Sequence, residues 1–440
     1  MADLKAIDTL GRRSLDPGQG QRRDGVLWSR ALFQILGALA VAVAMPYGIA
    51  GLVTPALMRL DVYYVSMAAS CLAIVAGFWM FRNLSGFPGI RASYYILPVF
   101  LSTFVAAFTI LFMTRLGYSR PLLVISLLGS LGWFYLVYFM LQRRQRLVIA
   151  VVPQGRVDSL YGIDSVVWHR LGDPVLPPSC ALVTADFDHD LTPAWLNFLA
   201  ECALEGVSVI HFKQLRQSLT GQVQIEHLSE NANGALEPNA SYIAAKRLID
   251  TVVALAVLPA LLPLFAILVV LIRLDSPGPA FFHQVRIGYR GRPFKVWKFR
   301  TMVMAQSRSP EDGPLERAMT RRRDPRVTRI GRWLRRTRID ELPQIFNILK
   351  GEMSWIGPRP EAEELSRWYE RELPFYRYRH VVRPGISGWA QVSQGHVTEL
   401  DEVLKKLNYD FFYISRCTLW IDVLILLRTL KTMLTGFGSR

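Results

Sequence analysis

One uninterrupted apolar stretch decides the fold of this chain: Thr251-Val-Val-Ala-Leu-Ala-Val-Leu-Pro-Ala-Leu-Leu-Pro-Leu-Phe-Ala-Ile-Leu-Val-Val-Leu-Ile272. It carries no charge, and as a helix it is long enough to cross about 30 Å of hydrocarbon. Pro259 and Pro263 lie near its middle, and each removes a backbone donor and can kink a helix. Hydropathy alone therefore predicts a membrane span, whereas the prolines predict a bend.

Basic residues on both sides of the stretch help to choose between these structures. Lys246 and Arg247 precede it, and a second group follows it: Arg273, Arg286, Arg290, Arg292, Lys295, Lys298 and Arg300. Cations at both ends indicate that both ends stay on the cytoplasmic side of a membrane. We therefore expect residues 246–280 to form a re-entrant helix that enters one leaflet, bends and returns.

Four further apolar stretches lie toward the N-terminus, at about 28–53, 63–82, 93–114 and 118–141. Each is long enough to span a membrane, and the short connections predict antiparallel neighbours. Arginines precede the first stretch and follow the fourth, which predicts that both tails are cytoplasmic. We expect a cytoplasmic tail over 1–27 and four transmembrane helices over 28–145.

The next segment, 146–239, has the character of a small soluble domain with a linker. Short β-branched runs predict three strands, at 147–152, 181–185 and 207–212. An apolar face over 192–204 predicts a helix between the last two strands. Strands that alternate with a helix predict a Rossmann-like α/β domain.

The turn after the first of these strands, Val152-Pro-Gln-Gly-Arg156, lacks the GxGxxG pattern of a dinucleotide site. A structural or regulatory module is therefore favoured over nucleotide binding in this domain. Residues 214–240 are rich in Gln, Ser, Asn and Gly, which predicts a loop or hairpin and a linker.

The bulk composition supports a membrane protein, mainly α-helical. The chain has 440 residues, 51% of them hydrophobic, and a formal net charge of +16. With apolar spans in the same chain, this charge favours anionic headgroups and phosphorylated substrates over nucleic acid. The four cysteines form no CxxC pair, so no zinc site or disulfide framework is expected: Cys71, Cys180, Cys202 and Cys417.

A run of arginines marks the region that carries chemistry. Arg321–Arg338 contains nine arginines and one acid. Val327, Ile330, Trp333 and Leu334 recur among them at helical spacing, which predicts a basic amphipathic helix in the headgroup layer. Arginine also suits bidentate binding of phosphate oxygens.

Two adjacent acids, Asp340 and Glu341, end this run. Pro343 suits the first turn of a helix, so the acids are expected at or just before a helix N-terminus. An isolated Asp there is most often an N-cap. Beside many arginines, however, the pair can hold a divalent cation and a phosphate, and a carboxylate can accept a phosphoryl group. Mg²⁺ bound by both acids would screen the repulsion between the attacking carboxylate and a diphosphate.

Two rigid loops and a last apolar segment follow the acids. Gly357-Pro-Arg-Pro360 holds an arginine between two prolines. Arg383-Pro-Gly385 likewise places an arginine beside a proline, in a glycine-rich turn. Together in one basic domain they favour a phosphate-lined pocket. Tyr409–Leu434 is aromatic and then apolar but contains Asp422, which favours an interfacial helix over a span, with a core helix as the alternative.

Six motifs in this region occur in a set order: Lys246-Arg-Leu-Ile-Asp250, Lys298-Phe-Arg-Thr-Met302, Asp324-Pro-Arg-Val-Thr-Arg-Ile-Gly331, Asp340-Glu-Leu-Pro-Gln344, Gly357-Pro-Arg-Pro360 and Arg383-Pro-Gly-Ile-Ser-Gly-Trp-Ala-Gln391. Together they resemble the bacterial sugar transferases, or monotopic phosphoglycosyl transferases, over about 240–435. The four spans and the α/β domain look like the large branch, which initiates exopolysaccharide, capsule or O-antigen synthesis.

The resemblance implies a catalytic domain over 240–440 that transfers a sugar 1-phosphate from a UDP-sugar to undecaprenyl phosphate and releases UMP. Asp340 would be the nucleophile that forms an aspartyl phosphosugar, and Glu341 would support it and bind Mg²⁺. The family's smaller members carry Ser-Pro at the bend of the re-entrant helix, where this chain has Leu262 and Pro263. The substrate would be held by Lys298, Arg300, Arg335, Pro358, Arg359, Pro360 and Arg383.

The resemblance also implies a location and partners. The enzyme would lie in the bacterial inner membrane among its lipids, with the catalytic domain on the cytoplasmic face. UDP-glucose and UDP-galactose are the leading sugar donors, a homodimer is favoured, and no nucleic-acid partner is implied.

Two rival functions stay open. A polytopic transferase would place its site among the spans, but these hold almost no acids. A membrane scaffold or polysaccharide-export regulator would keep the fold without the activity.

Overall fold

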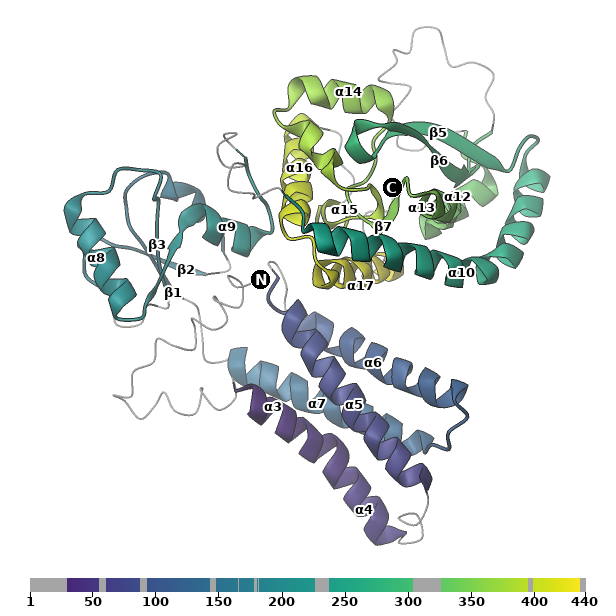
Figure 1. Ribbon diagram of the computed structural model, residues 1–440, viewed down its shortest axis with the longest axis horizontal. Coiled ribbons are helices and arrows are strands. Elements are labelled where there is room, and N and C mark those ends of the chain that lie inside the picture. The colour runs from purple at the N-terminus through teal and green to yellow at the C-terminus, as the bar shows by residue number, and fades with distance from the viewer. Residues whose placement is uncertain are drawn as a thin grey trace. The chain divides into compact units, whose positions relative to one another are not determined.

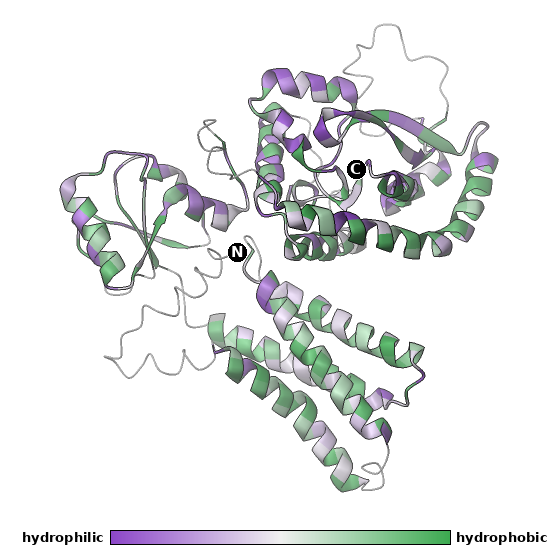
Figure 2. Cartoon of the chain, in the orientation of Figure 1, coloured by the Kyte–Doolittle hydropathy of each residue, from purple (hydrophilic) through white to green (hydrophobic). Residues whose placement is uncertain are grey.

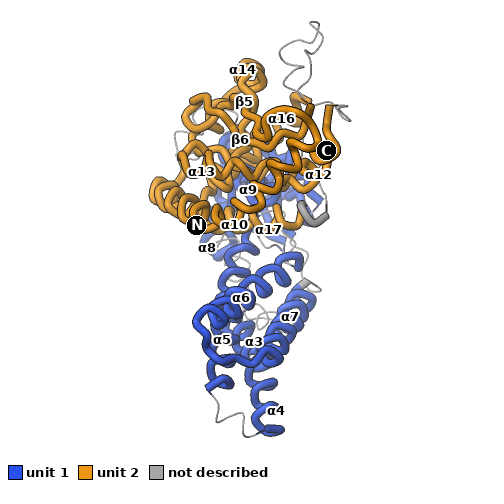
Figure 3. Tube along the Cα trace, turned by 90° about the vertical axis from the view of Figure 1, so that its right-hand side faces the viewer, with its two compact units in different colours: residues 1–221 blue, residues 222–440 orange. Residues whose placement is uncertain are grey.

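The computed structural model describes residues 30–54, 61–87, 93–142, 148–164, 166–177, 180, 182–225, 237–303, 326–394 and 399–435. The described chain is mostly helical and divides into two compact units, Met1–Gly221 and Gln222–Arg440 (Figure 3). The predicted tail over 1–27, Asp324 and the start of the arginine run lie outside the described residues.

Unit 1 contains four long apolar helices (Figures 1 and 2). The first is continuous through α3 (Ala31–Leu39), the π-helical turn η1 (Ala40–Ala44) and α4 (Met45–Val53); the others are α5 (Asp61–Leu84), α6 (Ser93–Met113) and α7 (Arg120–Gln142). Each is long and apolar enough to cross a membrane, and the bounds lie within a few residues of those predicted.

Helix α7 packs against each of the other three apolar helices. Phe134 of α7 stacks on Phe100 of α6, with ring centroids 4.5 Å apart. Trp133 donates its indole N–H to the carbonyl oxygen of Gln34 in α3 at 2.9 Å. On the other faces, large apolar side chains such as Leu72 and Ile110 are exposed. Such surfaces suit hydrocarbon rather than water, so these helices indicate a membrane protein.

The rest of unit 1 is an α/β domain built on a four-stranded parallel sheet, in the order β2-β1-β3-β4. Its strands are β1 (Val148–Val151), β2 (Val167–Arg170), β3 (Leu182–Ala185) and β4 (Ser208–His211). Alternate residues of β1 and β3 face α8 (Pro193–Leu204) on one side of the sheet. The others face α9 (Phe212–Thr220) and the short η3 (Val157–Leu160) on the opposite side.

This domain confirms the three predicted strands and their helix, and it corrects two expectations. Strand β2 was not predicted, because this edge strand is largely exposed and its pattern does not alternate. The predicted loop over 214–240 is wrong for 214–220, which belong to α9. His211 caps that helix by accepting the backbone N–H of Lys213 on Nδ1, and Gly221 ends it with a φ of 70°.

Unit 2 begins with α10 (Ala240–Asp275), one helix that includes both Pro259 and Pro263. A straight helix of 36 residues would measure about 54 Å, but Figure 1 shows α10 turning between its two ends. Both ends bind the same unit. Near the start Arg247 donates to the carbonyl oxygens of Ile348 and Leu349.

The end of α10 is held by α12 and by Arg300, which comes just after residues 293–299, a strand of the following hairpin. Asp275 accepts the backbone N–H of Ile330 at 3.1 Å. Arg300 donates to the carbonyl oxygens of Ser276 and Pro277. Because both ends of α10 contact one compact unit, the helix cannot be a straight rod leading away from it.

The remainder of unit 2 is built from short elements. Strands β5 (Phe281–Ile287) and β6 (Pro293–Phe299) form an antiparallel hairpin, and β7 (Ser354–Ile356) pairs in parallel with β8 (Gly385–Ser387). The helices are α12 (Arg329–Thr337), α13 (Ile345–Lys350), α14 (Glu363–Glu372), α15 (Trp389–Ser393), α16 (Leu400–Ser415) and α17 (Leu419–Thr435), with 3-10 turns η5 (Tyr289–Gly291), η6 (Ile339–Gln344) and η7 (Tyr376–Val381).

The C-terminal segment corrects the expectation of one interfacial helix over Tyr409–Leu434. The chain breaks between α16 and α17, and Phe411 and Phe412 are core residues at the end of α16. Asp422 of α17 is buried and accepts hydrogen bonds from Tyr242, Lys246 and Tyr413. A carboxylate that marked an interfacial helix in the sequence therefore anchors the start of α10.

Candidate active site

Local chain geometry brings Asp340 and Glu341 into the interior of unit 2. The hydroxyl of Thr328 caps α12 by accepting the backbone N–H of Gly331 at 2.9 Å. Arg338 ends that helix in the left-handed region, with a φ of 57°. The chain then enters η6, whose first turn contains both acids, and α13 begins just after it. The prediction that the acids precede a helix N-terminus is confirmed.

Two cations hold the carboxylate of Glu341. Lys298 of β6 donates from Nζ to Oε1 at 2.9 Å. Arg359 makes a fork-like contact, with Nη2 2.6 Å from Oε1 and Nη1 3.3 Å from Oε2. All three side chains are largely buried, and charge-assisted hydrogen bonds of this kind are strong and directional. Glu341 is thus an ionised carboxylate with both oxygens engaged.

Asp340 differs from its neighbour. It is also buried, but within the described residues its carboxylate accepts no hydrogen bond and has no cation within 4 Å. Its charge is met at longer range by Lys298, Arg359 and Arg335. The site therefore pairs one saturated carboxylate with one whose oxygens are available to a ligand.

The two acids also differ in proton affinity. Burial and the adjacent Glu341 carboxylate raise the pKa of Asp340 to about 6. Burial would raise the pKa of Glu341 as well, but Arg359 and Lys298 outweigh it and hold that pKa well below its usual range. Two neighbouring carboxylates with separated pKa values are a frequent mark of an active site.

The loop that carries Arg359 is clamped by two other arginines. Arg379 of η7 donates from Nη2 to the carbonyl oxygen of Arg359 at 2.8 Å. Arg286 of β5 donates from Nη1 to the next carbonyl oxygen, that of Pro360. The guanidinium of Arg359 is thereby directed at Glu341 by a backbone fixed on both sides.

The two rigid loops predicted from the sequence lie backbone against backbone. Gly357 donates its N–H to the carbonyl oxygen of Ser387, and Gly385 donates to that of Pro358. A Cβ on Gly385 would lie 2.0 Å from the backbone nitrogen of Gly357, so only glycine fits there. The two loops are therefore neighbours in the fold, and the phosphate-lined pocket expected from them stays a prediction.

The remaining predicted binding residues are placed differently. Arg335 acts on Asp340 through its charge. Arg300 makes its hydrogen bonds to Ile272, Ser276 and Pro277 at the end of α10. Arg383 donates to the carbonyl oxygen of Gly351 and lies over the ring of Tyr289. Neither Arg300 nor Arg383 bonds to the acids within the described residues, and both bind backbone carbonyls instead.

Sequence reasoning missed three groups around the site. Arg286 was noted only as a flanking charge. In the hairpin register it faces the same side as Gln284 and Lys298. Arg379 and Asp410 form a buried ion pair at 2.8 Å that no motif signalled. Asn347 bonds to the backbone of both Lys295 and Trp297, tying the hairpin to α13.

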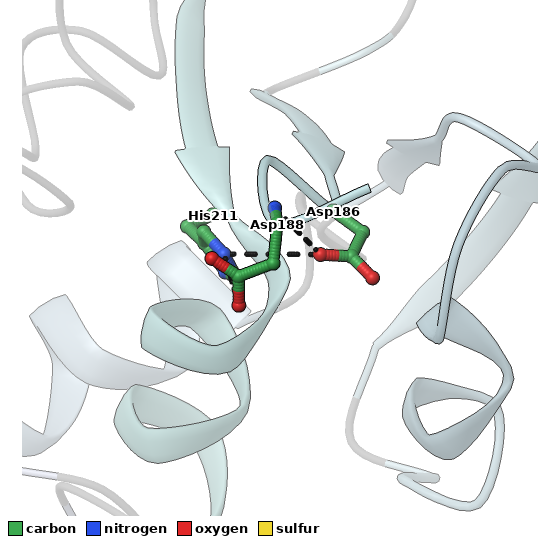
Figure 4. Close-up of side chains that lie close together, drawn as sticks. All are labelled: Asp186, Asp188 and His211. Carbon is green, nitrogen blue, oxygen red and sulfur yellow. Dashed lines mark hydrogen bonds and ion pairs between the residues drawn. The ribbon is translucent and has the colours of Figure 1, made fainter. Parts of the chain in front are cut away.

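A second cluster, Asp186, Asp188 and His211, lies at the carboxyl ends of β3 and β4 (Figure 4). Its contacts favour an ion-pair network over a metal site. Lys213 pairs with Asp188 at 3.0 Å. Because Nδ1 of His211 accepts a backbone N–H, neutral His211 carries its proton on Nε2, which faces the two carboxylates at 3.5 and 3.9 Å.

Asp186 also occupies the position where a nucleotide phosphate would lie. Its carboxylate accepts the backbone N–H groups of Arg156 and Asp188, at 2.8 and 3.0 Å. A Cβ on Gly155 would lie 2.5 Å from this carboxylate. Since β1 and β3 flank the point where the strand order reverses, this is the usual ligand crevice of such sheets. An anionic side chain there disfavours phosphate.

The chain is similar in sequence to known proteins. Residues 241–436 match the family model described as bacterial sugar transferase. The chain is 42% identical over 373 residues to the UDP-N-acetylgalactosamine-undecaprenyl-phosphate N-acetylgalactosaminephosphotransferase of Aeromonas hydrophila, covering 83% of this chain and 86% of that relative.

Two other relatives match a smaller share of the chain. The UDP-glucose:undecaprenyl-phosphate glucose-1-phosphate transferase of Xanthomonas campestris pv. campestris is 40% identical over 211 residues, which cover 48% of this chain and 42% of that relative. The enzyme of the same description from Escherichia coli (strain K12) is 39% identical over 197 residues, which cover 44% and 40%.

Proposed function

This chain belongs to the bacterial sugar transferase family, and from that premise we propose that it transfers a sugar 1-phosphate from a UDP-sugar to undecaprenyl phosphate. It is an enzyme of the undecaprenyl-phosphate sugar phosphotransferase type. The observation that carries the proposal is the difference between the two neighbouring carboxylates of the site, Asp340 and Glu341. Within the described residues, Asp340 has a buried carboxylate that makes no hydrogen bond or ion pair, whereas both oxygens of Glu341 are paired.

Asp340 is the nucleophile in this proposal. Its carboxylate oxygen forms a bond to the sugar-bearing phosphorus of the UDP-sugar, and the bond from that phosphorus to the bridging oxygen breaks. The electron pair leaves on the bridging oxygen as part of UMP, and Asp340 carries the phosphosugar. An oxygen of undecaprenyl phosphate then attacks the same phosphorus, and the Asp340 carboxylate is released from a polyprenyl diphosphate sugar.

The role of Glu341 in this proposal is to position the cations Lys298 and Arg359. Its two oxygens fix the Nζ of Lys298 and the guanidinium of Arg359 beside Asp340. These groups are oriented before substrate arrives, so they can meet the charge on the phosphoryl oxygens without reorganising. Arg335 adds positive charge near Asp340.

The carboxylate oxygens of Asp340 suit Mg²⁺, whereas those of Glu341 are already engaged by cations. The carboxylate of Asp340 is free of hydrogen bonds within the described residues, and hard oxygen donors suit this ion. Glu341 has only its remaining lone pairs to offer, so Asp340 would be the principal ligand. Bound Mg²⁺ would neutralise part of the charge on the diphosphate.

The sugar donor we propose first is UDP-N-acetylgalactosamine. The relative from Aeromonas hydrophila that carries this name aligns over 83% of the chain. The two relatives named for glucose align over only 48% and 44% of it. UDP-glucose and UDP-galactose, expected from the sequence, stay in the panel to be tested.

We propose that α10 is a re-entrant membrane helix bent near Leu262 and Pro263. Leu262 is exposed, as are neighbouring apolar side chains such as Leu255 and Ile267. Both ends of the helix are nevertheless bound to unit 2. A bent helix in one leaflet satisfies both observations. The four helices of unit 1 would span the inner membrane as a bundle, which leaves the site on the cytoplasmic face.

The test uses the purified full chain with Mg²⁺, radiolabelled UDP-sugar and undecaprenyl phosphate. Without the polyprenyl acceptor, we expect about one UMP per enzyme and a radiolabelled protein. Asp340→Asn should give neither, while Asp401→Asn, an exposed acid of α16, should behave as wild type. Undiminished UMP release by Asp340→Asn would refute the assignment. EDTA should abolish turnover, and added Mg²⁺ should restore it.

A further inference from the structure

Arg286 is a cation on which Glu361 and Glu341 act only through their charge, without a direct contact among the described residues. Its guanidinium donates from Nη1 to the carbonyl oxygen of Pro360 and from Nη2 to Oε1 of Gln284 at 3.2 Å. Both acceptors are neutral. Among the described residues no carboxylate oxygen lies within 4 Å of it, and its buried Nε–H has no hydrogen-bond partner. An unpaired buried donor on a charged group calls for an acceptor that the protein itself does not supply.

Arg379 of η7, which contacts the same loop, provides a comparison. It holds the carbonyl oxygen of Arg359 as Arg286 holds that of Pro360. Its charge, however, is neutralised by Asp410 through contacts of 2.8 and 3.1 Å, and Tyr376 accepts a further N–H. A carbonyl clamp on this loop therefore does not require an uncompensated charge. The lack of a partner acid for Arg286 is a separate property that needs its own explanation.

The charges around Asp340 and Glu341 do not balance. Lys298, Arg335 and Arg359 interact with them, and Arg286 interacts with Arg359, Glu361 and Glu341. Glu361 has its own direct partner in Lys406, so among the described residues these four cations face the two carboxylates of Asp340 and Glu341. Burial and the neighbouring Arg359 guanidinium lower the pKa of Arg286 to about 10, because they outweigh the opposing charges of Glu361 and Glu341. The excess of two positive charges equals the charge of a nucleotide-sugar diphosphate at neutral pH.

We infer that Arg286 binds a phosphate oxygen of the sugar nucleotide, completing the diphosphate site together with Lys298 and Arg359. The inference rests on the proposed function, since it takes a diphosphate as the ligand. Arg286 belongs to β5, whereas Lys298 belongs to β6 and Arg359 to the loop after β7. Cations from three separate elements can surround a diphosphate on different sides, which one loop could not.

Binding is the direct test, measured with UDP and with uridine on the purified full chain carrying Asp340→Asn to prevent turnover. Arg286→Gln should weaken UDP binding by about 10- to 100-fold, the range for a lost hydrogen bond between charged groups. Uridine, which lacks the phosphates, should bind as before. Arg286→Lys keeps the charge and should recover most of the affinity for UDP.

Arg292→Gln is the matched control. Arg292 lies on the same hairpin and is exposed, so its loss changes the net charge equally but outside the site, and UDP affinity should not change. Melting temperatures of all variants identify folding defects, and Arg286→Lys remains informative where Arg286→Gln is unstable. Equal affinity of wild type and a folded Arg286→Gln for UDP would overturn the inference, as would an equal loss for uridine.

The outcome is separable from the proposed function. A wild-type chain that releases no UMP from any UDP-sugar contradicts the function itself. A chain that turns over normally, and whose Arg286→Gln variant retains its KM for UDP-sugar, contradicts only the role of Arg286.

Discussion

The guanidinium of Arg359 lies 2.6 Å from Oε1 of Glu341 through Nη2, in a contact largely withdrawn from solvent. The carboxylate next to it in the chain, Asp340, has no comparable partner among the described residues. This asymmetry distinguishes two adjacent acids of similar burial. In the proposed function, Glu341 holds the cations in place and Asp340 reacts.

The rate of UMP release should fall on the acid side of about pH 6. The reaction needs ionised Asp340, whose pKa is raised to about 6 by burial and Glu341, so the reactive fraction is lost as the pH falls through that value. Glu341→Gln removes a cause of the increase and leaves Lys298 and Arg359 facing Asp340. The acid limb should then move to lower pH while the maximal rate falls. A limb that stays in place in this variant contradicts the assignment.

Asn347→Ala should destabilise unit 2. Its side chain accepts the N–H of Trp297 at 3.0 Å and donates to the carbonyl oxygen of Lys295 at 2.8 Å. Removing it takes away the partner of two backbone groups of the hairpin, at the net cost of two hydrogen bonds, about 1–3 kcal/mol. The apparent Tm of the purified chain should drop clearly. Asn408→Ala, at a half-buried position of α16, is the comparison and should change it little; similar drops in both would show that Asn347 has no special role.

Gly385→Ala should disable the site without touching a charged group. The added Cβ would lie 2.0 Å from the backbone nitrogen of Gly357 and must push apart the loop that carries Arg359. We expect UMP release to fall at least tenfold at an enzyme concentration that saturates the wild-type assay. Gly172→Ala is the control, because a Cβ there meets nothing within 4 Å. Near-normal activity of Gly385→Ala would mean that the two loops do not need this close contact.

Cysteine labelling in intact cells tests the proposed topology of α10. In a background with the four native cysteines replaced, single cysteines at Leu248 and at Arg290 should both be shielded from a membrane-impermeant reagent added outside. Leu116→Cys, in the exposed link between α6 and α7, should be labelled under the same conditions. Labelling at either Leu248 or Arg290 would show that α10 crosses the membrane or faces outward, and would refute re-entry.

Sequence patterns alone located the long elements, because their determinants are local. A continuous apolar run such as Thr251–Ile272 must avoid water wherever the chain goes, and β-branched runs such as 181–185 favour buried strands. The adjacency of Asp340 and Glu341 in the chain likewise makes them neighbours in any fold. What local pattern could not reveal was α9, whose start depends on a cap by His211 and whose end depends on a left-handed Gly221.

Only the tertiary structure distinguished the roles of residues that look alike in the sequence. Arg300, Arg359 and Arg379 are all arginines in a basic domain, yet one binds carbonyls at the end of α10, one binds Glu341 and one pairs with Asp410. Electrostatic partners are chosen by distances between segments far apart in the chain, and composition does not contain those distances. The sequence by itself thus determined that Asp340 and Glu341 stand together among cations. The fold decided that, among the described residues, Glu341 is directly paired and Asp340 is not, because Lys298 and Arg359 come from other elements and make hydrogen bonds to only one of the two carboxylates.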